Sequence, residues 1–196
     1  MAELTVQRLF IALWPDSVVR HHLVELQNSL PPNNGQRVKS DNLHITLLFL
    51  GATTAAQREC LEQRLDHMAA APFTLSLTQL GYWRKSQVVW VGSKTPPALL
   101  SLVKQMQDAA TQCKFTVGSR PFQPHLTLCR KVRPGQPAFP AMTAPIAWDV
   151  RDYALVGSFT EVTGVRYRVL RTWPLQPRRS HDRGICAQRS LSMNKI

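Results

Sequence analysis

Acidic residues are scarce in this chain of 196 residues, which has 12 Asp and Glu against 24 Lys and Arg. The formal net charge is therefore +12, and the isoelectric point lies near 10.3. The few acidic residues form no cluster of carboxylates that would hold a divalent cation. The basic excess favours a polyanionic partner, with nucleic acid as the first expectation and an anionic membrane surface as the second.

Long hydrophobic runs are missing as well. No stretch approaches the roughly 18 consecutive apolar residues that a membrane-spanning helix needs. The N-terminus lacks the charged region and apolar core of a secretory signal, so we expect a cytoplasmic protein. A role at a membrane surface is the weaker expectation, because no predicted helix combines a basic face with a strongly apolar one.

Cysteine is sparse, and its spacing excludes the usual metal-binding patterns. The four cysteines are widely separated, without a C-x-x-C pair: Cys60, Cys113, Cys129 and Cys186. In a chain without a signal sequence we predict free thiols. A structural zinc site is not expected, because zinc needs a compact Cys and His cluster. Cys129 is interpreted as a small packing residue rather than a nucleophile.

Two segments of the chain contain the same sequence motif, His-apolar-Thr-Leu. Residues 42–51 read NLHITLLFLG, and residues 124–130 read PHLTLCR. Both are rich in the aliphatic residues of strands, in which successive side chains point to opposite faces. This alternation places each His on the same face of its strand as the Thr two residues later. It puts Ile45, Leu47 and Phe49 on the other face, which is expected to be buried. If the two strands are neighbours, both polar pairs line one groove.

The remaining pattern alternates strands with amphipathic helices. Val19, Leu23, Leu26 and Leu30 mark one helical face, and Thr54 to Gln57 resembles a capping box before the next helix. A third helix is expected after Pro96 and Pro97. Strands are predicted at these places: 7–14, 42–51, 73–78, 88–91, 124–130, 148–157 and 165–173. The strands at 73–78 and 88–91 are expected to form a hairpin, with a turn at 81–86.

This order predicts an α+β fold with an antiparallel or mixed sheet and two related lobes. We expect a single bilobal domain over residues 1–176, with a Pro-rich loop at 134–145. Residues 177–196 hold five basic residues and one Asp, with little apolar periodicity. They are interpreted as a basic, flexible tail.

Two imidazoles in one groove form an acid–base pair, because an unperturbed His titrates near pH ~6.5. Cleavage of a phosphodiester needs this division: one His accepts a proton from the attacking group and the other protonates the departing oxygen. Thr46 and Thr127 can donate hydrogen bonds to phosphate oxygens, and Arg130 can add positive charge. Strict alternation places Arg130 on the opposite face from Thr127, so it needs a bend to reach the groove. This chemistry requires neither a metal nor a cofactor.

One His-x-Thr on a strand is more often structural than catalytic, whereas two on strongly apolar strands favour a catalytic pair. His21, His22, His67 and His181 are interpreted as surface residues. The aromatic residues Phe10, Trp83, Trp90 and Tyr167 are assigned to the core, with one of them open to stacking on a base.

Segments 42–51 and 120–130 resemble the two signature segments of the two-histidine phosphoesterase superfamily. Within it, the match is closest to bacterial RNA 2′,3′-cyclic phosphodiesterases, formerly called 2′-5′ RNA ligases. Residues 8–12 and 81–90 are similar to that subgroup too, and the resemblance runs from about residue 7 to about 175. It implies a bilobal α+β fold with a pseudo-twofold axis, two sheets flanking a central groove and helices on the outer faces.

The resemblance also implies an activity: opening of a terminal 2′,3′-cyclic phosphate of RNA to a 2′-phosphomonoester, without a metal. His44 would then be the proton donor and His125 the proton acceptor, with Thr46, Thr127 and Arg130 at the phosphate. Expected partners are RNA ends of this kind, tRNA fragments or cyclic nucleotides, bound by a monomer. Two alternatives stay open: 2′-5′ RNA ligation at the same site, and a non-catalytic protein that binds RNA through its basic surface.

Overall fold

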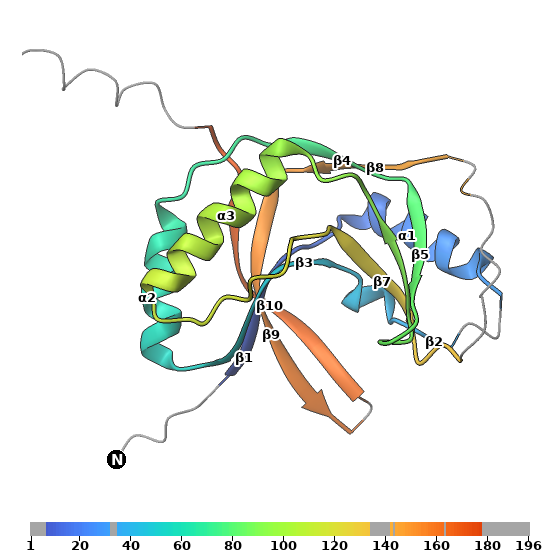
Figure 1. Ribbon diagram of the computed structural model, residues 1–196, viewed down its shortest axis with the longest axis horizontal. Coiled ribbons are helices and arrows are strands. Elements are labelled where there is room, and N and C mark those ends of the chain that lie inside the picture. The colour runs from blue at the N-terminus through green and yellow to red at the C-terminus, as the bar shows by residue number, and fades with distance from the viewer. Residues whose placement is uncertain (1–6, 32–34, 134–141, 143, 163, 178–196) are drawn as a thin grey trace, which may run out of the picture.

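The computed structural model describes residues 7–31, 35–133, 142, 144–162 and 164–177 (Figure 1). The predicted tail, apart from its first residue, and most of the Pro-rich loop lie outside the described residues. The helices are α1 (Ser17–Ser29), α2 (Ala55–Asp66), α3 (Pro97–Gln112) and the short 3-10 helix η1 (Ser40–Asn42). The strands are β1 (Gln7–Leu13), β2 (Gln36–Arg37), β3 (Ile45–Thr53), β4 (Phe73–Leu77), β5 (Gln79–Trp83), β6 (Val88–Gly92), β7 (His125–Arg130), β8 (Ile146–Val150), β9 (Asp152–Glu161) and β10 (Gly164–Pro174).

Within the described part of the chain, eight strands form one antiparallel sheet in the order β10-β9-β1-β3-β7-β6-β5, with β2 paired to β7. The two strands that carry the His-x-Thr motifs are neighbours at its centre. They meet through one residue pair, Ile45 with Leu126. The sheet is therefore two halves joined at the motif strands, which is the arrangement that the predicted bilobal α+β fold requires.

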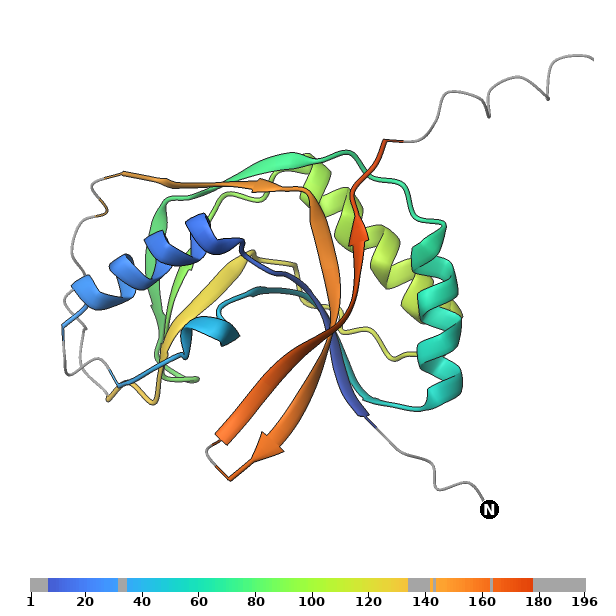
Figure 2. The ribbon, with the colours of Figure 1, turned by 180° about the vertical axis from the view of Figure 1, so that it is seen from behind.

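Each half repeats the unit strand, helix, strand, and the helix crosses to the other half. Helix α1 follows β1 but contacts β7, whereas α3 follows β6 and contacts β3. Both views of the molecule show α2 and α3 together at one half and α1 at the other (Figures 1 and 2). This exchange of helices explains why both motif strands are buried on one face and why the large core contains residues of both halves.

Side-chain caps mark the start of two helices, and the one at α2 confirms the capping box predicted from the sequence. The Asp16 side chain accepts a hydrogen bond from the backbone N–H of Val19 at the start of α1. Thr54 and Gln57 form the predicted reciprocal capping box of α2. Such caps satisfy N–H groups that have no partner inside the helix. They fix where each helix begins after its strand.

The predicted strand over 148–157 is wrong as one element. The chain leaves one sheet and enters another at Arg151: β8 pairs with β4 in a small two-stranded sheet, and β9 pairs with β1 in the main sheet. The predicted hairpin is also wrong in its first strand. The strand that pairs with β6 is β5, formed by residues 79–83, which overlap the predicted turn.

The prediction that all cysteines are free thiols is wrong for one pair. Cys60 of α2 and Cys113 at the end of α3 form a disulfide, and the two residues are 53 positions apart. No sequence pattern indicates this bond, because the pairing depends on how α2 and α3 pack. Cys129 is a free thiol in the core, as predicted.

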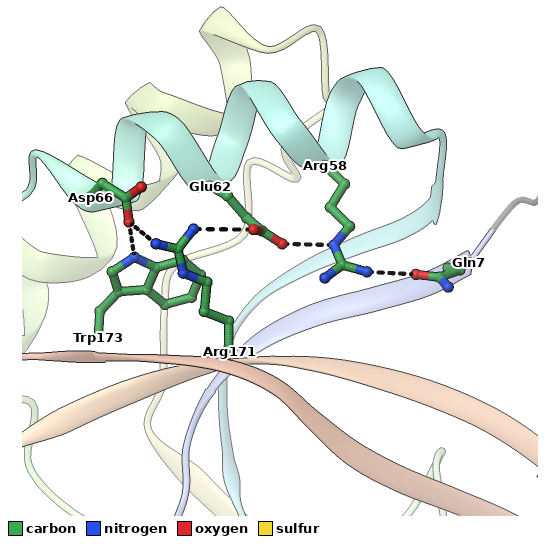
Figure 3. Close-up of polar contacts among 6 residues, drawn as sticks. All are labelled: Gln7, Arg58, Glu62, Asp66, Arg171 and Trp173. Carbon is green, nitrogen blue, oxygen red and sulfur yellow. Dashed lines mark hydrogen bonds and ion pairs between the residues drawn. The ribbon is translucent and has the colours of Figure 1, made fainter.

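Ion pairs and hydrogen bonds join α2 to β10 and, through the bond that Arg58 donates to Gln7 at 3.2 Å, to β1 (Figure 3). Arg171 of β10 contacts Glu62 at 3.2 Å and Asp66 at 2.6 Å, and Asp66 also accepts a hydrogen bond from the Trp173 indole at 2.7 Å. Glu62 accepts a further bond from Arg58. Hydrogen bonds to charged groups are stronger than neutral ones. The network holds the inner end of the β9–β10 hairpin, whose outer end extends away from the helices (Figure 2).

Candidate active site

The groove at the junction of β3 and β7 brings all five predicted site residues together. Its volume is about 630 Å³, within the range of small-molecule sites. Strands from both halves line it, with the β9–β10 hairpin along one side. Its lining includes His44, Thr46, His125, Thr127 and Arg130.

The two histidines have the same local geometry. The Nδ1 atom of His44 lies 2.6 Å from the carbonyl oxygen of Asn42, and that of His125 lies 2.9 Å from the carbonyl oxygen of Gln123. A carbonyl can only accept, so Nδ1 carries the proton in both rings. This leaves Nε2 as the atom that gains or loses a proton. The Nε2 atom of His44 lies 3.1 Å from the hydroxyl of Thr46.

A β-bulge follows the Thr in each motif. In β3 the pairing with β1 skips Leu47, and in β7 the pairing with β6 skips Leu128. One extra residue reverses the alternation of side chains beyond it. The bulge in β7 therefore supplies the bend that Arg130 needs, and Arg130 lines the groove three residues after Thr127.

The same bulges correct two predictions from strict alternation. Alternation predicts Phe49 on the buried face, but it is 71% exposed and lines the groove. Alternation also predicts Cys129 on the groove face, but it is 1% exposed and packs in the core. Burial raises the pKa of the Cys129 thiol, which fits a packing role and not a nucleophile.

Burial and positive charge act on both imidazoles. Burial is the largest cause that lowers the pKa of His44; with the charges of Arg130 and His125, and against the opposing bond to Asn42, it brings this pKa to about 4. Burial and Arg130 lower the pKa of His125 in the same way. A bound anion acts in the opposite direction, because it favours the protonated ring. Together with the positive charge of Arg130, this response of the two rings favours a negatively charged ligand in the groove.

Aromatic rings enclose His44. Trp14 stacks on it with ring centroids 5.5 Å apart, while Phe10 and Tyr167 lie 5.0 and 5.1 Å away. On the other half, the Trp83 ring is 4.4 Å from His125. Sequence reasoning misses Trp14, and it assigns Tyr167 and Trp83 to the core although both line the groove.

Asn42 is a further residue to which sequence reasoning gives no role. Its side-chain amide donates to the carbonyl of Val165 at 3.0 Å and accepts from the N–H of Tyr167 at 3.2 Å. Its own carbonyl accepts the bond from His44. Through these three hydrogen bonds Asn42 orients the imidazole of His44 and also holds the part of β10 that carries Tyr167. The signal that the sequence offers is the place of Asn42 at the start of segment 42–51, two residues before His44.

The other predictions on single residues concern histidines and metals. His21, His22 and His67 are exposed as predicted, and His181 lies outside the described residues. In the ranges that the structure describes, no three His, Cys, Asp or Glu side chains gather as a metal site would require. Nor does that part of the chain contain a helix long and apolar enough to cross a bilayer. Metal-independent chemistry stays a prediction.

Two imidazoles, two hydroxyls and a guanidinium line one groove, and these are chemical groups that can act in phosphoester cleavage. The chain belongs to the 2′-5′ RNA ligase superfamily, whose family model matches residues 14–159. This membership agrees with the resemblance that the two motifs carry.

Similar proteins are found along most of the chain. The RNA 2′,3′-cyclic phosphodiesterase of Escherichia coli is 33% identical in an alignment of 176 positions that covers 86% of this chain and 97% of that protein. The protein of the same name from Thermus thermophilus is 31% identical, covering 86% of this chain and 90% of its own. Crystal structures of Escherichia coli LigT, in apo form and with 3′-AMP, each match with a TM-score of 0.80 at 31% identity, covering 87% of this chain and 98% of that one.

Proposed function

We propose that this protein hydrolyses terminal 2′,3′-cyclic phosphates of RNA to 2′-phosphomonoesters, without a metal, through His44 and His125. The observation that carries the proposal is the groove in which both imidazoles, held with Nδ1 protonated, flank Thr46, Thr127 and Arg130. Relatives that share most of the chain are named for this activity.

In the proposed reaction His125 is the base and His44 the acid. The Nε2 atom of His125 takes a proton from water, whose oxygen attacks phosphorus. The bond from phosphorus to the 3′ oxygen breaks, and the Nε2–H of His44 protonates that oxygen. The product carries a 2′-phosphate and a 3′ hydroxyl. Before the next turnover His125 returns its proton to solvent and His44 regains one.

The remaining groups stabilise charge that develops on the non-bridging phosphate oxygens. Arg130 supplies a full positive charge at the groove, and the two Thr hydroxyls supply hydrogen bonds. The lowered pKa values keep both imidazoles mostly neutral at pH 7 before the substrate binds. The negative charge of the bound phosphodiester raises them, so that the acid is protonated when the substrate is present.

The test uses a short RNA with a 2′,3′-cyclic phosphate end, incubated with the purified protein in EDTA. We expect a 2′-phosphate end, formed by the wild type and reduced by about 10²–10⁴ in both His44→Ala and His125→Ala. His67→Ala, which changes an exposed histidine outside the groove, is the matched control and keeps full rate. Full activity of either groove variant, or loss of activity in EDTA, would reject the mechanism.

Ligation is the second candidate, because the family itself is described by 2′-5′ RNA ligase activity. The same groups would serve when a 5′ hydroxyl attacks phosphorus in place of water: His125 takes the hydroxyl proton, the bond from phosphorus to the 3′ oxygen breaks, His44 protonates that oxygen, and a 2′-5′ linkage forms. Adding an RNA with a 5′ hydroxyl end to the assay separates the two: a longer product shows joining, and only the 2′-phosphate shows hydrolysis. Salt-sensitive RNA binding without either product would favour the non-catalytic alternative.

The finer identity of the substrate belongs to the same proposal. We expect tRNA fragments and cyclic nucleotides to be accepted, and a cytoplasmic monomer to act on them. The groove holds the reacting end, so comparing cyclic mononucleotides with longer RNA measures how much the rest of the RNA contributes. Equal kcat/KM for both would limit recognition to the terminal nucleotide.

A further inference from the structure

Helix α1 buries a polar side chain against β7. Gln27 is 5% exposed, whereas Leu26, which the apolar pattern places on the buried face, is only half-buried. The side-chain nitrogen of Gln27 donates to two carbonyl oxygens, at 2.9 Å to Val38 and at 2.7 Å to Leu128. A buried amide with both hydrogens used is costly to lose, because each of the two carbonyls would lose one donor.

The second of these carbonyls belongs to the bulge of β7. Leu128 is the residue that the pairing with β6 skips. A bulge disrupts the ladder locally, and buried carbonyls need partners. Here the partners come from outside β6: the amide of Gln27 and the N–H of Val38, the latter at 2.9 Å. Gln27 therefore stabilises the bulged conformation of β7 in particular.

That bulge decides where Arg130 points. Without the extra residue at Leu128, strict alternation would turn Arg130 away from Thr127 and put Cys129 in the groove. We propose that Gln27 is a positioning residue: by bonding the Leu128 carbonyl it holds the bulge and so keeps Arg130 directed at the phosphate. The inference deepens the proposed function and rests on it for the effect on turnover.

The first test measures binding of inorganic phosphate by NMR titration at pH 7. Gln27→Met keeps the length of the side chain and removes the donors, and we expect phosphate affinity to fall about three- to tenfold. Leu23→Ala is the matched control, because Leu23 is fully buried on the same helix. It lowers thermal stability while leaving phosphate affinity unchanged. Unfolding followed by circular dichroism confirms that every variant is folded at the assay temperature.

The second test is a double-mutant cycle with Arg130→Ala. If Gln27 acts through Arg130, Gln27→Met weakens phosphate binding when Arg130 is present. In the Arg130→Ala background the same substitution has no further effect. Equal losses in both backgrounds would show a general structural role and overturn the proposal. An unchanged affinity of Gln27→Met, or no phosphate binding by the wild type, overturns it too.

The same variants separate this proposal from the proposed function. Hydrolysis of a cyclic phosphate by the four proteins of the cycle is measured beside phosphate binding. One outcome is that the effect of Gln27→Met on phosphate affinity depends on Arg130 while the wild type hydrolyses nothing. That result rejects the enzymatic function and keeps the positioning role. Hydrolysis by the wild type with additive losses keeps the enzyme and rejects the role of Gln27.

Discussion

The lowered pKa of His44 has a consequence for folding that can be measured without any substrate. Its pKa is about 4 in the folded protein against 6.5 for an unperturbed ring. The unfolded chain therefore binds a proton between these pH values and the folded protein does not. The contribution of this pKa shift to the free energy of unfolding is fully present above pH 6.5 and is lost as the pH falls toward 4.

The size of this effect follows from the two pKa values. The full shift corresponds to about 3 kcal/mol, since each pKa unit is about 1.4 kcal/mol. At pH 5 about 2 kcal/mol of it is already lost relative to pH 7.5. His44→Gln carries no titrating group, so the pH dependence of its free energy of unfolding should be smaller by that amount.

Urea denaturation at pH 7.5 and pH 5, in phosphate-free buffer, measures both proteins. His67→Gln serves as the control, because it makes the same replacement at an exposed histidine outside the groove. An equal loss of stability in the wild type and in His44→Gln would refute the reasoning that burial in the groove disfavours the imidazolium.

The geometry leads to four further predictions. Both imidazole pKa values lie below 6.5, so kcat/KM for a cyclic phosphate should fall about tenfold per unit above pH 6.5, and Arg130→Met should move this limb to higher pH. Asn42→Ala should lower kcat about tenfold and loosen β10 in hydrogen exchange, because it releases Val165 and Tyr167. Replacing Cys60 and Cys113 together by Ala should cost up to about 4 kcal/mol in urea unfolding with kcat unchanged, since their bond closes a loop of 53 positions. Gly35→Ala should lower the free energy of unfolding by at least about 2 kcal/mol, because its φ is +77° and a Cβ would lie 2.3 Å from the Arg130 carbonyl oxygen.

Each of these four predictions has a contrary result. A flat or rising kcat/KM between pH 6.5 and 8.5 would contradict the lowered pKa values. Unchanged kcat and exchange in the Asn42 variant would remove its role at the edge of β10. Equal stability without the disulfide, or with Ala at position 35, would contradict the packing of α2 on α3 or of β2 on β7.

Local patterns in the sequence determined much of this protein. The doubled His-x-Thr spelling, the apolar alternation around it and the helix caps predicted an α+β fold and named His44, Thr46, His125 and Thr127, which the structure brings to one groove. These signals need only neighbouring residues, because strand alternation and capping act over a few positions.

Tertiary structure alone decided the rest. Whether Arg130 or Cys129 faces the groove depends on a bulge, and a bulge is a property of two paired strands and not of one. The bond from Gln27 to Leu128, the disulfide and the turn of the chain between β8 and β9 likewise join distant residues. The lowered pKa of His44 arises from burial beneath Trp14, Phe10 and Tyr167, an enclosure that exists only when β1, β3 and β10 are assembled.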